Sequence, residues 1–553
     1  MRITSDTHLS YPELTLFQAL EKAALAWPAS PALEFYGRKI SFASFREDIL
    51  TCARALAALG VKAGDTVTIC LPNVPQAMTA FYAVSRLGAA AQMLHPQSAR
   101  KEIEYALRLT ACRLIITLDM FYETVIAAVR NVDPSITVIV ARTEDELPAA
   151  AAAAFSLTAG RKYLGFPYAG EGILWKAFMK TGRAEIPLPE VGFDRSHTGV
   201  YLWSGGTSGS PKAIALSDYS FNACAVQARA AIDEEFGPGL SMLSCMPCFH
   251  GFGLCMNLHA ALIFGVCCLL MPSFNIKTYA KTLIRNKPNY IAGVPTIFDA
   301  LLGIPNLENA DLSFLKGMFC GGDTLPIPLK QKVDAFLAAR GASIQIREGY
   351  GLTECVTACC LTPKDESREG SIGLPFPDTD YRIVKPGTAE ELPAGETGEI
   401  ILTGPTLMQG YLGEPEETAD ALRVLPDGRR WLYTGDLGCI DGDGFVYFRG
   451  RIKRMIITNG FNVYPITLEQ LLLSDPEVKE ACVVGVPDPR RMHKVKAVIV
   501  PAAGADEAAL RSRLEALLTE SVARYALPRE YAFVQAVPRT VLGKIDYRKL
   551  EEE

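Results

Sequence analysis

The stretch WSGGTSGSPKA, residues 203–213, contains three glycines, several hydroxyl side chains and one lysine. Small residues let backbone N–H groups converge on an anion, and a lysine adds positive charge. A Walker P-loop would also need a second glycine before the lysine and a Ser or Thr after it. Counting from Gly206, Pro211 and Ala213 occupy those two positions. The composition therefore predicts a phosphate-binding turn of another kind, and a flexible surface turn is the alternative.

The size and charge of the chain limit what can surround this turn. A chain of 553 residues is too long for one core and predicts two to four domains. Its hydrophobic content of 49% and charged content of 21% are typical of a soluble globular protein. The net charge of −6 provides no overall field that would attract nucleic acid. If ATP binds, local lysines, arginines and metal ions must supply the positive charge.

Cysteine usage indicates a reducing environment. The 15 cysteines are odd in number and scattered, and the first residues, MRITSDTHLS, do not resemble a signal peptide. These features favour a cytoplasmic protein. The pair Cys245 and Cys248 has C-x-x-C spacing, but no second pair lies at zinc-ligand distance, so both are predicted to be small buried hydrophobic residues.

Residues 252–272, FGLCMNLHAALIFGVCCLLMP, are long enough to span a membrane. The stretch also contains Asn257 and His259 and lacks flanking basic residues. We therefore predict a helix followed by a strand, both buried in a large core, and no transmembrane segment.

The first half of the chain alternates between two kinds of hydrophobic pattern. Residues 17–28 and 74–90 have helical spacing, whereas 65–73, 113–118 and 136–141 are short apolar runs typical of strands. This alternation predicts layers of parallel α/β structure. The six alanines at 149–154 are interpreted as a surface helix without chemistry.

The texture changes after residue 370, where Gly and Asp turns separate short strands and predict a compact antiparallel region. A further unit of about a hundred residues, the commonest domain size, begins near Ile452. We predict an N-terminal domain over 1–450, a hinge at 451–453 and a C-terminal domain over 454–553.

Six stretches in order along the chain resemble the adenylate-forming (ANL) superfamily, specifically its acyl-CoA synthetase or AMP-dependent synthetase and ligase family. They are GDTVTICLPN (64–73), SGGTSGSPKA (204–213), YGLTE (350–354), WLYTGD (431–436), RGRIKRMI (449–456) and RTVLGKID (539–546). The resemblance covers about residues 15 to 550. It implies an α/β fold with layered subdomains, a β-barrel-like subdomain and a small mobile α+β C-terminal domain.

The resemblance also implies a reaction in two halves that uses ATP, Mg²⁺ and CoA. A carboxylate attacks the α-phosphate of ATP to give acyl-AMP and pyrophosphate, and a thiol then takes the acyl group and releases AMP. The residues assigned to the β- and γ-phosphates are Ser204, Gly205, Gly206, Thr207, Ser208, Gly209 and Lys212. Hydroxyl and N–H groups would donate hydrogen bonds there, and the lysine would offset charge.

Other motifs are assigned to the rest of the nucleotide. Tyr350, followed by Gly351, would place its ring on adenine, Thr353 would contact the α-phosphate, and Glu354 would hold Mg²⁺ through oxygen. Without the resemblance, a Tyr at a strand end is usually a packing residue and a lone Glu a solvated one. Gly321, Gly322 and Asp323 resemble the loop at the adenine edge, although a plain turn would use the same residues.

Ribose recognition is assigned to Asp436 and Arg451, which otherwise would be interpreted as a turn aspartate and a surface arginine. Lys544 is the lysine that would bridge the carboxylate and the α-phosphate, where a fixed cation relieves the approach of two anions. Lys453 lies at the presumed hinge, and rotation there would bring the region of Gly460 to the thiol. Arg454 stands where the family usually has an acidic residue.

The loop MPCFHGFG (246–253) bears on the acid substrate. Members that activate amino acids carry an aspartate after its aromatic residue, whereas this chain has His250. His250 could gate the carboxylate site or could be a core histidine. The apolar surroundings favour a hydrophobic acid, with a fatty acid as the leading candidate. Ile457 stands where light-producing members carry a lysine, which weakens a luciferase interpretation.

The leading hypothesis is therefore an acid–thiol ligase whose partners are a small-molecule carboxylic acid, hydrophobic in character, and CoA. One rival passes the acyl group to a carrier-protein phosphopantetheine. A second rival is a non-catalytic nucleotide-binding protein, against which the retention of Lys212, Glu354, Asp436, Arg451 and Lys544 speaks.

Overall fold

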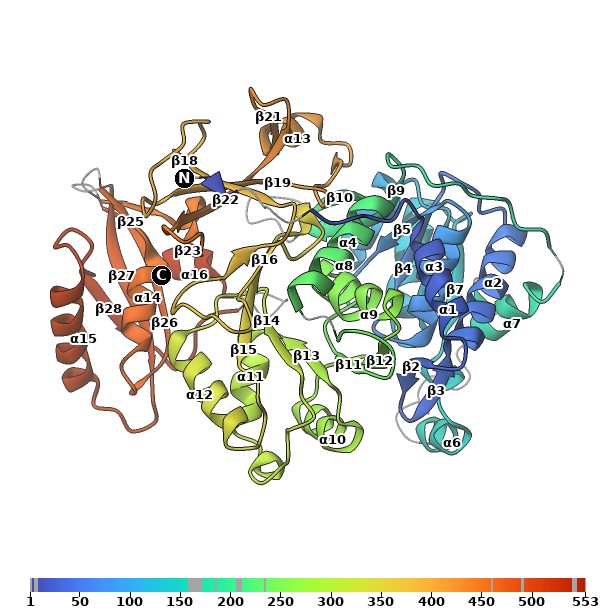
Figure 1. Cartoon of the computed structure of the whole chain (residues 1–553), viewed down its shortest axis with the longest axis horizontal. Coiled ribbons are helices and arrows are strands. Elements are labelled where there is room, and N and C mark those ends of the chain that lie inside the picture. The colour runs from blue at the N-terminus through green and yellow to red at the C-terminus, as the bar shows by residue number, and fades with distance from the viewer. Residues whose placement is uncertain are drawn as a thin grey trace.

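The computed structural model describes residues 2–3, 8–157, 172–184, 186–204, 211–232, 235–458, 461–488, 492–539 and 545–552. These residues form four sheets and the helices that cover them (Figure 1). Of the predicted site residues, Gly205, Gly206, Thr207, Ser208, Gly209, Gly460 and Lys544 lie outside the described residues.

An eight-stranded sheet built around six parallel strands forms the first α/β layer. Its order is β20-β10-β9-β5-β4-β6-β7-β8. The strands are β4 (Thr66–Cys70), β5 (Ala90–Met93), β6 (Leu114–Leu118), β7 (Thr137–Ala141), β8 (Ile173–Leu174), β9 (Thr198–Ser204), β10 (Lys212–Ser217) and β20 (Gly410–Tyr411). The helices in this part of the chain are α1 (Leu16–Ala26), α2 (Phe42–Ala58), α3 (Pro75–Arg86), α4 (Arg100–Leu109), η1 (Asp119–Phe121), α5 (Tyr122–Val132), η2 (Thr143–Asp145), α6 (Ala149–Leu157), α7 (Trp175–Thr181) and α8 (Asp218–Ile232). The predicted alternation of helix and strand is confirmed here.

A nine-stranded sheet forms the second layer, in the order β17-β16-β15-β14-β13-β11-β12-β2-β3. The strands are β2 (Pro31–Phe35), β3 (Arg38–Ser41), β11 (Ser241–Ser244), β12 (Cys267–Leu270), β13 (Tyr290–Gly293), β14 (Gly317–Cys320), β15 (Ile346–Tyr350), β16 (Cys360–Leu361) and β17 (Leu374–Pro375). The helices of this part are α9 (Ala260–Ile263), α10 (Ile276–Asn286), α11 (Pro295–Leu302), η5 (Pro305–Leu307) and α12 (Ile327–Ala338). All pairings from β15 to β2 are parallel, so their carboxyl ends meet at one edge.

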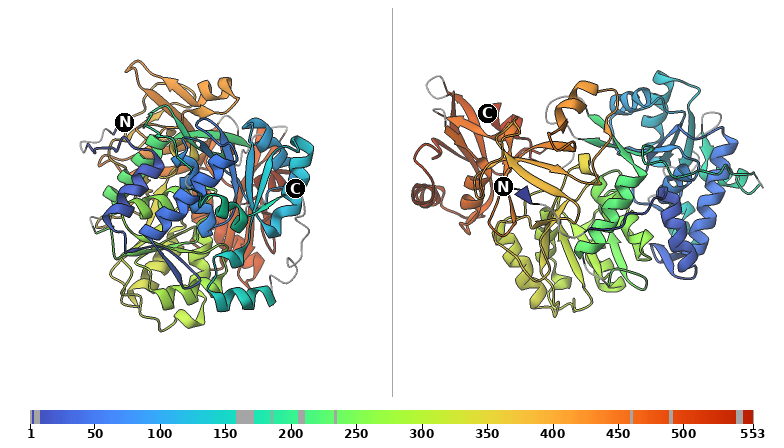
Figure 2. Two further views of the ribbon diagram at one scale, coloured as in Figure 1. Left: turned by 90° about the vertical axis from the view of Figure 1, so that its right-hand side faces the viewer. Right: turned by 45° about the horizontal axis from the view of Figure 1, so that its top comes forward.

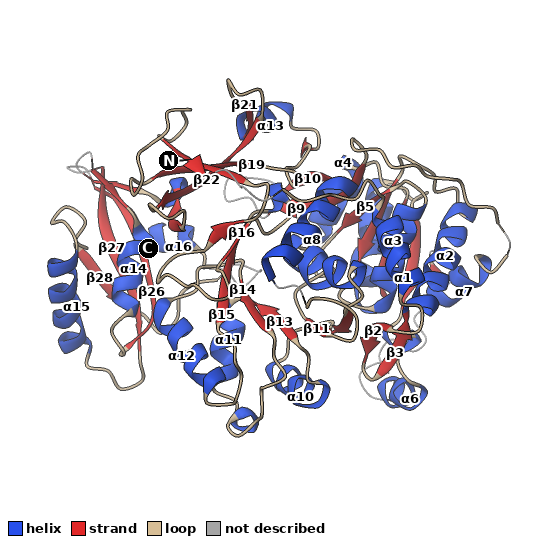
Figure 3. Ribbon diagram, in the orientation of Figure 1, coloured by secondary structure: helices blue, strands red, loops and turns tan. Residues whose placement is uncertain are grey.

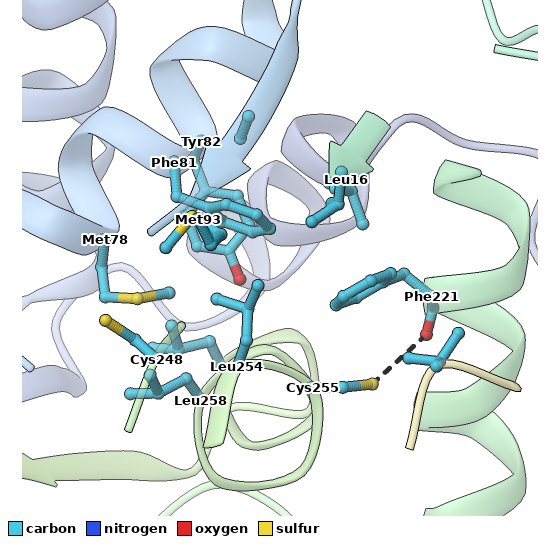
Figure 4. Packing of buried hydrophobic residues seen from close by; sticks show 14 of the residues in the cluster. Leu16, Met78, Phe81, Tyr82, Met93, Phe221, Cys248, Leu254, Cys255 and Leu258 are labelled. Atoms are coloured by element: carbon cyan, nitrogen blue, oxygen red, sulfur yellow. Dashed lines mark hydrogen bonds between the residues drawn. The ribbon is translucent and has the colours of Figure 1, made fainter. Parts of the chain in front are cut away.

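Helices fill the space between the two sheets and hold the main core. Helix α3 contacts β4 and β5 of the first sheet, and α9 contacts β12 of the second. Figure 4 shows Phe81 and Tyr82 of α3 beside Leu254 and Leu258, within one cluster of buried side chains. Burying such large apolar groups from both layers joins the two sheets into one body.

The apolar stretch 252–272 lies inside this core. It forms a π-helical segment over Phe252–His259, then α9, then strand β12, as predicted. Buried Tyr82 and Asn222 satisfy the polar ring of His259: their Oη and Oδ1 atoms each lie 3.0 Å from a ring nitrogen. Burial lowers the pKa of His259 to about 3, so the ring is neutral. Within the described residues, no helix combines the length and apolarity needed to cross a bilayer.

The region after residue 370 forms the predicted antiparallel sheet, in the order β1-β18-β19-β22-β21 with β23 paired to β22. Its strands are β1 (Arg2–Ile3), β18 (Asp380–Val384), β19 (Gly398–Thr403), β21 (Leu422–Val424), β22 (Arg430–Ile440) and β23 (Val446–Arg451). Two short helices, η6 (Thr353–Cys355) and α13 (Pro415–Ala421), lie in the segments near it.

The last unit lies at the end of the molecule opposite α1 and α2 (Figure 2). It combines helices and strands, as predicted (Figure 3). Its elements are η7 (Ile452–Arg454), β24 (Ile456–Thr458), β25 (Phe461–Val463), α14 (Pro465–Leu473), β26 (Val478–Asp488), β27 (Met492–Pro501), α15 (Glu507–Ser521), β28 (Glu530–Phe533) and α16 (Tyr547–Glu552). Alternate residues of β26 enter two different cores: Val483 packs with Leu514 of α15, and Val484 packs with Leu550 of α16.

All 15 cysteines lie in described parts of the chain, are buried and form no disulfide. This agrees with the interpretation of Cys245 and Cys248 as small hydrophobic residues. No group of three or more His, Cys, Asp or Glu side chains in the described ranges could hold a metal ion.

Candidate active site

The predicted nucleotide residues gather where the second sheet meets the antiparallel sheet. Strand β15 ends at Tyr350, and the YGLTE loop leaves the sheet there. On the other side, Asp436 of β22 pairs directly with Arg451 of β23. Three segments that are distant in sequence thus lie together because two sheets place them there.

A strained turn holds the YGLTE loop. Val356 has φ +67° and ψ −61°, and Thr357 N donates to Cys355 O at 2.8 Å. This is a classic-sense γ-turn, which is rare and costly for a β-branched residue. The strained residue directly follows the η6 helix that carries Thr353 and Glu354. Strain at this point is consistent with a loop whose shape matters for function.

Two glycines make room for this loop. A Cβ on Gly351 would lie 1.4 Å from Thr357 O, and one on Gly251 would lie 2.0 Å from Val356 O. The backbone therefore approaches itself at both positions more closely than any side chain allows. The second contact also shows that the segment following His250 packs directly on the YGLTE loop.

Tyr350, Asp436 and Arg451 form a connected group. The Tyr350 hydroxyl donates to Asp436 Oδ2 at 2.7 Å, and Arg451 Nε lies 3.4 Å from Asp436 Oδ1. The Tyr350 ring is partly buried, with its centroid 5.9 Å from that of Phe448. Asp436 Oδ1 is buried and accepts no hydrogen bond from the described residues. One carboxylate oxygen is thus held in place, and the other can accept a hydrogen bond from a ligand.

Burial controls the protonation of Asp436. Its side chain is only 3% exposed, and desolvation raises its pKa to about 6, with a smaller raising contribution from Glu354. Arg451 and the Tyr350 hydroxyl act in the opposite direction, so the carboxylate is largely ionised at neutral pH. The influence of Glu354 shows that the two carboxylates lie within electrostatic reach of each other.

Lys212 and Glu354 meet through a third residue, Tyr411. The ammonium of Lys212 forms an ion pair with Glu417 of α13 and lies 4.7 Å from the centre of the Tyr411 ring. The Tyr411 hydroxyl donates to Glu354 Oε1 at 3.0 Å. Ser204 and Lys212 are opposite each other on β9 and β10, at the two ends of the glycine-rich stretch. The cation and carboxylate predicted for the triphosphate are therefore neighbours.

His250 lies at the start of the π-helical segment. Its backbone N donates to Pro247 O at 3.1 Å, and its carbonyl accepts from Leu254 N at 2.8 Å. The ring is partly buried, with its centroid 4.9 Å from that of Phe249. Nearby, a Cβ on Gly321 would lie 3.7 Å from the Phe252 ring. The segment predicted to bear on the acid, 246–253, and the loop predicted at the adenine edge, 321–323, are thus in contact.

The loop at 321–323 and the hinge region are more open. Gly322 adopts φ +79°, which favours glycine, and Asp323 is exposed, with its Oδ1 accepting from Thr324 N at 2.9 Å. Lys453 is exposed within η7. Arg454 instead donates to Glu469 Oε1 at 2.6 Å and lies 3.6 Å from the centre of the Tyr547 ring. This packing accounts for the basic residue after the hinge, because Glu469 is buried and needs a partner.

Lys544 itself is outside the described residues, but the chain on both sides of it is anchored. Arg539 and Ile545 form an isolated antiparallel bridge, and Asp546 N donates to Pro538 O at 2.8 Å. The structure therefore fixes the two ends of the segment that carries this lysine.

Sequence reasoning missed Tyr411 and Glu417. Both lie in the region after residue 370 that was interpreted only as antiparallel β structure, and no local pattern indicates that they meet Lys212 and Glu354. It also missed Glu348 of β15, which is buried and accepts from Leu325 N at 3.0 Å. Burial raises the pKa of Glu348 to about 7.

The fold and this site define a nucleotide-binding enzyme of the adenylate-forming class. A family model described as "AMP-binding enzyme" matches residues 20–412, and one described as "AMP-binding enzyme C-terminal domain" matches residues 467–544. The chain belongs to the AMP-binding enzyme family. The predicted family and α/β fold are confirmed.

Relatives of similar length agree with this assignment. The chain is 33% identical to a long-chain-fatty-acid–CoA ligase of Bacillus subtilis over 552 residues, covering 99% of the chain and 95% of the relative. It is 30% identical to a feruloyl-CoA synthase of Amycolatopsis over 524 residues, covering 94% of each. The structure of ATP-bound MatB from Rhodopseudomonas palustris matches with a TM-score of 0.83 at 25% identity, over 97% of this chain and 98% of that one. The prediction of an AMP-forming acyl-CoA synthetase is confirmed by these matches.

Proposed function

We propose that this enzyme joins a long-chain fatty acid to CoA, with ATP cleaved to AMP and pyrophosphate. In the first step a carboxylate oxygen attacks the α-phosphorus, the α–β phosphoanhydride bond breaks and pyrophosphate leaves. In the second step the CoA sulfur attacks the acyl carbonyl, the bond to the phosphate oxygen breaks and AMP leaves with loss of the thiol proton. The observation that carries this proposal is the convergence of Lys212, Glu354, Tyr350 and Asp436 at one place.

Each of the predicted nucleotide residues would have its own part in binding ATP. Lys212 and the stretch 204–209 would hold the β- and γ-phosphates, where a cation and N–H donors offset charge. The Tyr350 ring would lie on adenine. The Oδ1 atom of Asp436, which accepts no hydrogen bond from the described residues, would accept one from a ribose hydroxyl, with Arg451 beside it. Thr353 and, by resemblance, Lys544 would act at the α-phosphate.

The residues present also fit Mg²⁺. This ion prefers one or two carboxylates together with substrate phosphates rather than a cage made only of protein groups. Glu354 supplies one such carboxylate beside Lys212, and no larger cluster of metal ligands exists among the described residues. When bound, Mg²⁺ would neutralise charge on the phosphates of ATP.

Domain movement would separate the two steps. We place the boundary at 451–453, between an N-terminal domain (1–450) and a C-terminal domain (454–553). Arg454 contacts both Glu469 and Tyr547 within the C-terminal unit, which supports a movement of this unit as one body. In the second orientation the region of Gly460 would face the thiol.

The acid is proposed to be long and apolar. His250 would meet its carboxylate, and the neighbouring Phe252 is packed against the apolar clusters on both sides. The Bacillus relative is named for long-chain fatty acids, which supports this choice. The name of the Amycolatopsis relative makes an aromatic acid the alternative. The free thiols of all cysteines support a reducing, cytoplasmic setting.

Product analysis tests the proposal. The enzyme is incubated with ATP, MgCl₂ and a panel of fatty and aromatic acids, with either CoA or a phosphopantetheinylated carrier protein, and thioesters are identified by mass spectrometry. We expect a long-chain acyl-CoA and an equal amount of AMP. A thioester formed only on the carrier protein would favour the rival acceptor, and AMP-forming activity confined to aromatic acids would replace the substrate class.

A further inference from the structure

Tyr411 lies between two groups that are predicted to serve different parts of the triphosphate. Its hydroxyl donates to Glu354 Oε1 at 3.0 Å, and its ring centre is 4.7 Å from the Lys212 ammonium. One side chain therefore contacts both the expected metal ligand and the expected phosphate cation. No motif of the sequence marks this residue for either role.

The backbone of Tyr411 is fixed independently of these contacts. Tyr411 pairs with Ile214, two residues after Lys212, on the neighbouring strand β10. On either side, Gln409 N donates to Ala215 O at 2.9 Å and Leu412 N donates to Ala213 O at 2.8 Å. The ring therefore stands on β20, the strand paired with the one that carries Lys212, and its hydroxyl binds Glu354 from that fixed position.

Glu354 is held twice by this segment. Met408 N donates to the Glu354 backbone carbonyl at 2.8 Å, while Tyr411 binds the carboxylate. A carboxylate with one oxygen fixed in this way presents the other in a defined direction. Hydrogen-bond partners that orient a metal ligand typically contribute tenfold or more to metal affinity.

We propose that Tyr411 is a positioning residue that holds Glu354 in the orientation needed for Mg²⁺ and keeps it in register with Lys212. This inference rests on the proposed function, because it assigns the metal to Glu354. The ring adds a second, separable effect: a cation above an aromatic face is attracted to it. Loss of the hydroxyl alone should weaken the binding of Mg²⁺. Loss of the whole ring should also disturb the position of the Lys212 ammonium.

Three variants separate these effects. Tyr411→Phe removes the hydroxyl and keeps the ring, and Tyr411→Leu removes both. Tyr433→Phe is the matched control, because the Tyr433 hydroxyl donates only to the backbone carbonyl of Thr388, at 3.1 Å. Binding of Mn²⁺ is followed by the loss of its free electron paramagnetic resonance signal, in the presence of α,β-methylene-ATP, which cannot be cleaved at the reacting bond.

We expect Tyr411→Phe to weaken Mn²⁺ binding by about tenfold and to leave the Kd of the metal-free analogue close to wild type. Tyr433→Phe should change neither the binding of Mn²⁺ nor that of the analogue. Tyr411→Leu should weaken the binding of the analogue as well as that of Mn²⁺. In the Glu354→Gln background, Tyr411→Phe should have no further effect on Mn²⁺, because its ligand is already lost.

Wild-type affinity for Mn²⁺ in Tyr411→Phe would overturn the inference, and so would an additive loss in the double variant Glu354→Gln/Tyr411→Phe. Absence of acid-dependent pyrophosphate release in the wild-type enzyme would instead overturn the proposed function. Metal binding would still be measured in that case, so the two failures can be distinguished.

Discussion

At the scale of single residues, Asp436 combines burial with a proposed role, recognition of the ribose, that requires charge. Its pKa of about 6 lies above the ordinary value of 3.8, so the folded state favours the protonated form. The contribution of this group to stability is therefore complete below pH 3.8 and is lost as the pH rises through about 6. To accept a hydrogen bond from a ribose hydroxyl on its Oδ1 atom, Asp436 needs the opposite form, the carboxylate.

We predict that ATP affinity increases as the pH rises from 5 to 7.5. At pH 5 the Asp436 carboxylate would be ionised in only about a tenth of the molecules, which should weaken the binding of ATP by roughly tenfold. Isothermal titration of ATP and of 2′,3′-dideoxy-ATP measures this. The dideoxy analogue titrates its phosphates equally but offers no ribose hydroxyl, so it serves as the control. Equal pH dependence of the two nucleotides would remove Asp436 from ribose recognition.

His250 is expected to contribute to the binding of the fatty acid and much less to the binding of ATP. His250→Ala should raise the KM of the fatty acid by about tenfold, the loss of one hydrogen bond to a charged group, and should change the KM of ATP much less. The exposed His8, whose ring contacts Asp378, provides the control variant His8→Ala. If the acid kinetics of His250→Ala match those of the wild type, the ring is only a packing residue beside Phe249.

At the scale of elements, the YGLTE loop depends on the absence of side chains. Gly351→Ala would place a Cβ 1.4 Å from Thr357 O, so the loop must move. We predict a loss of stability of about 1–3 kcal/mol, seen as a lower Tm, together with slower adenylation. Gly192→Ala is the control, since its Cβ would meet nothing within 4 Å. A fully stable and fully active Gly351→Ala would show that the loop geometry is not needed.

The elements that sequence predicted well are those with a strong local pattern. The run 113–118 became β6 over Leu114–Leu118, and the stretch 252–272 became a helix and a strand, because hydrophobic periodicity and length separate these outcomes. Strand β20 has only two residues, Gly410 and Tyr411, and exists because β10 pairs with it. No periodicity can signal an element that short.

The candidate site divides in the same way. Residues within motifs, such as Tyr350 and Asp436, could be assigned from the sequence, and the structure brings them to 2.7 Å of each other. Tyr411 could not be, because its partners Glu354 and Lys212 are set by the meeting of separate sheets. The γ-turn at Val356 also had no signal, since a β-branched residue is a poor candidate for positive φ.

At the scale of the whole molecule, the proposed domain movement implies that Lys544 of the C-terminal unit acts only in adenylation. We predict that Lys544→Ala slows adenylation by roughly 10²–10³-fold, the effect of losing one fixed charge-stabilising group. Formation of the thioester from supplied acyl-AMP and CoA should change little. Single-turnover assays of each half-reaction test this, and an equal loss in both would contradict the assigned role.

The proposed adenylation of a fatty acid is tested most directly by the acid-dependent exchange of labelled pyrophosphate into ATP. The exchange is measured with palmitate and MgCl₂ and without any thiol. Adenylation at the site proposed around Lys212, Glu354 and Asp436 predicts exchange that requires the acid and falls strongly in Asp436→Ala. Absence of exchange with palmitate and with every other acid tested, in an enzyme that still binds ATP, would show that this site does not adenylate an acid.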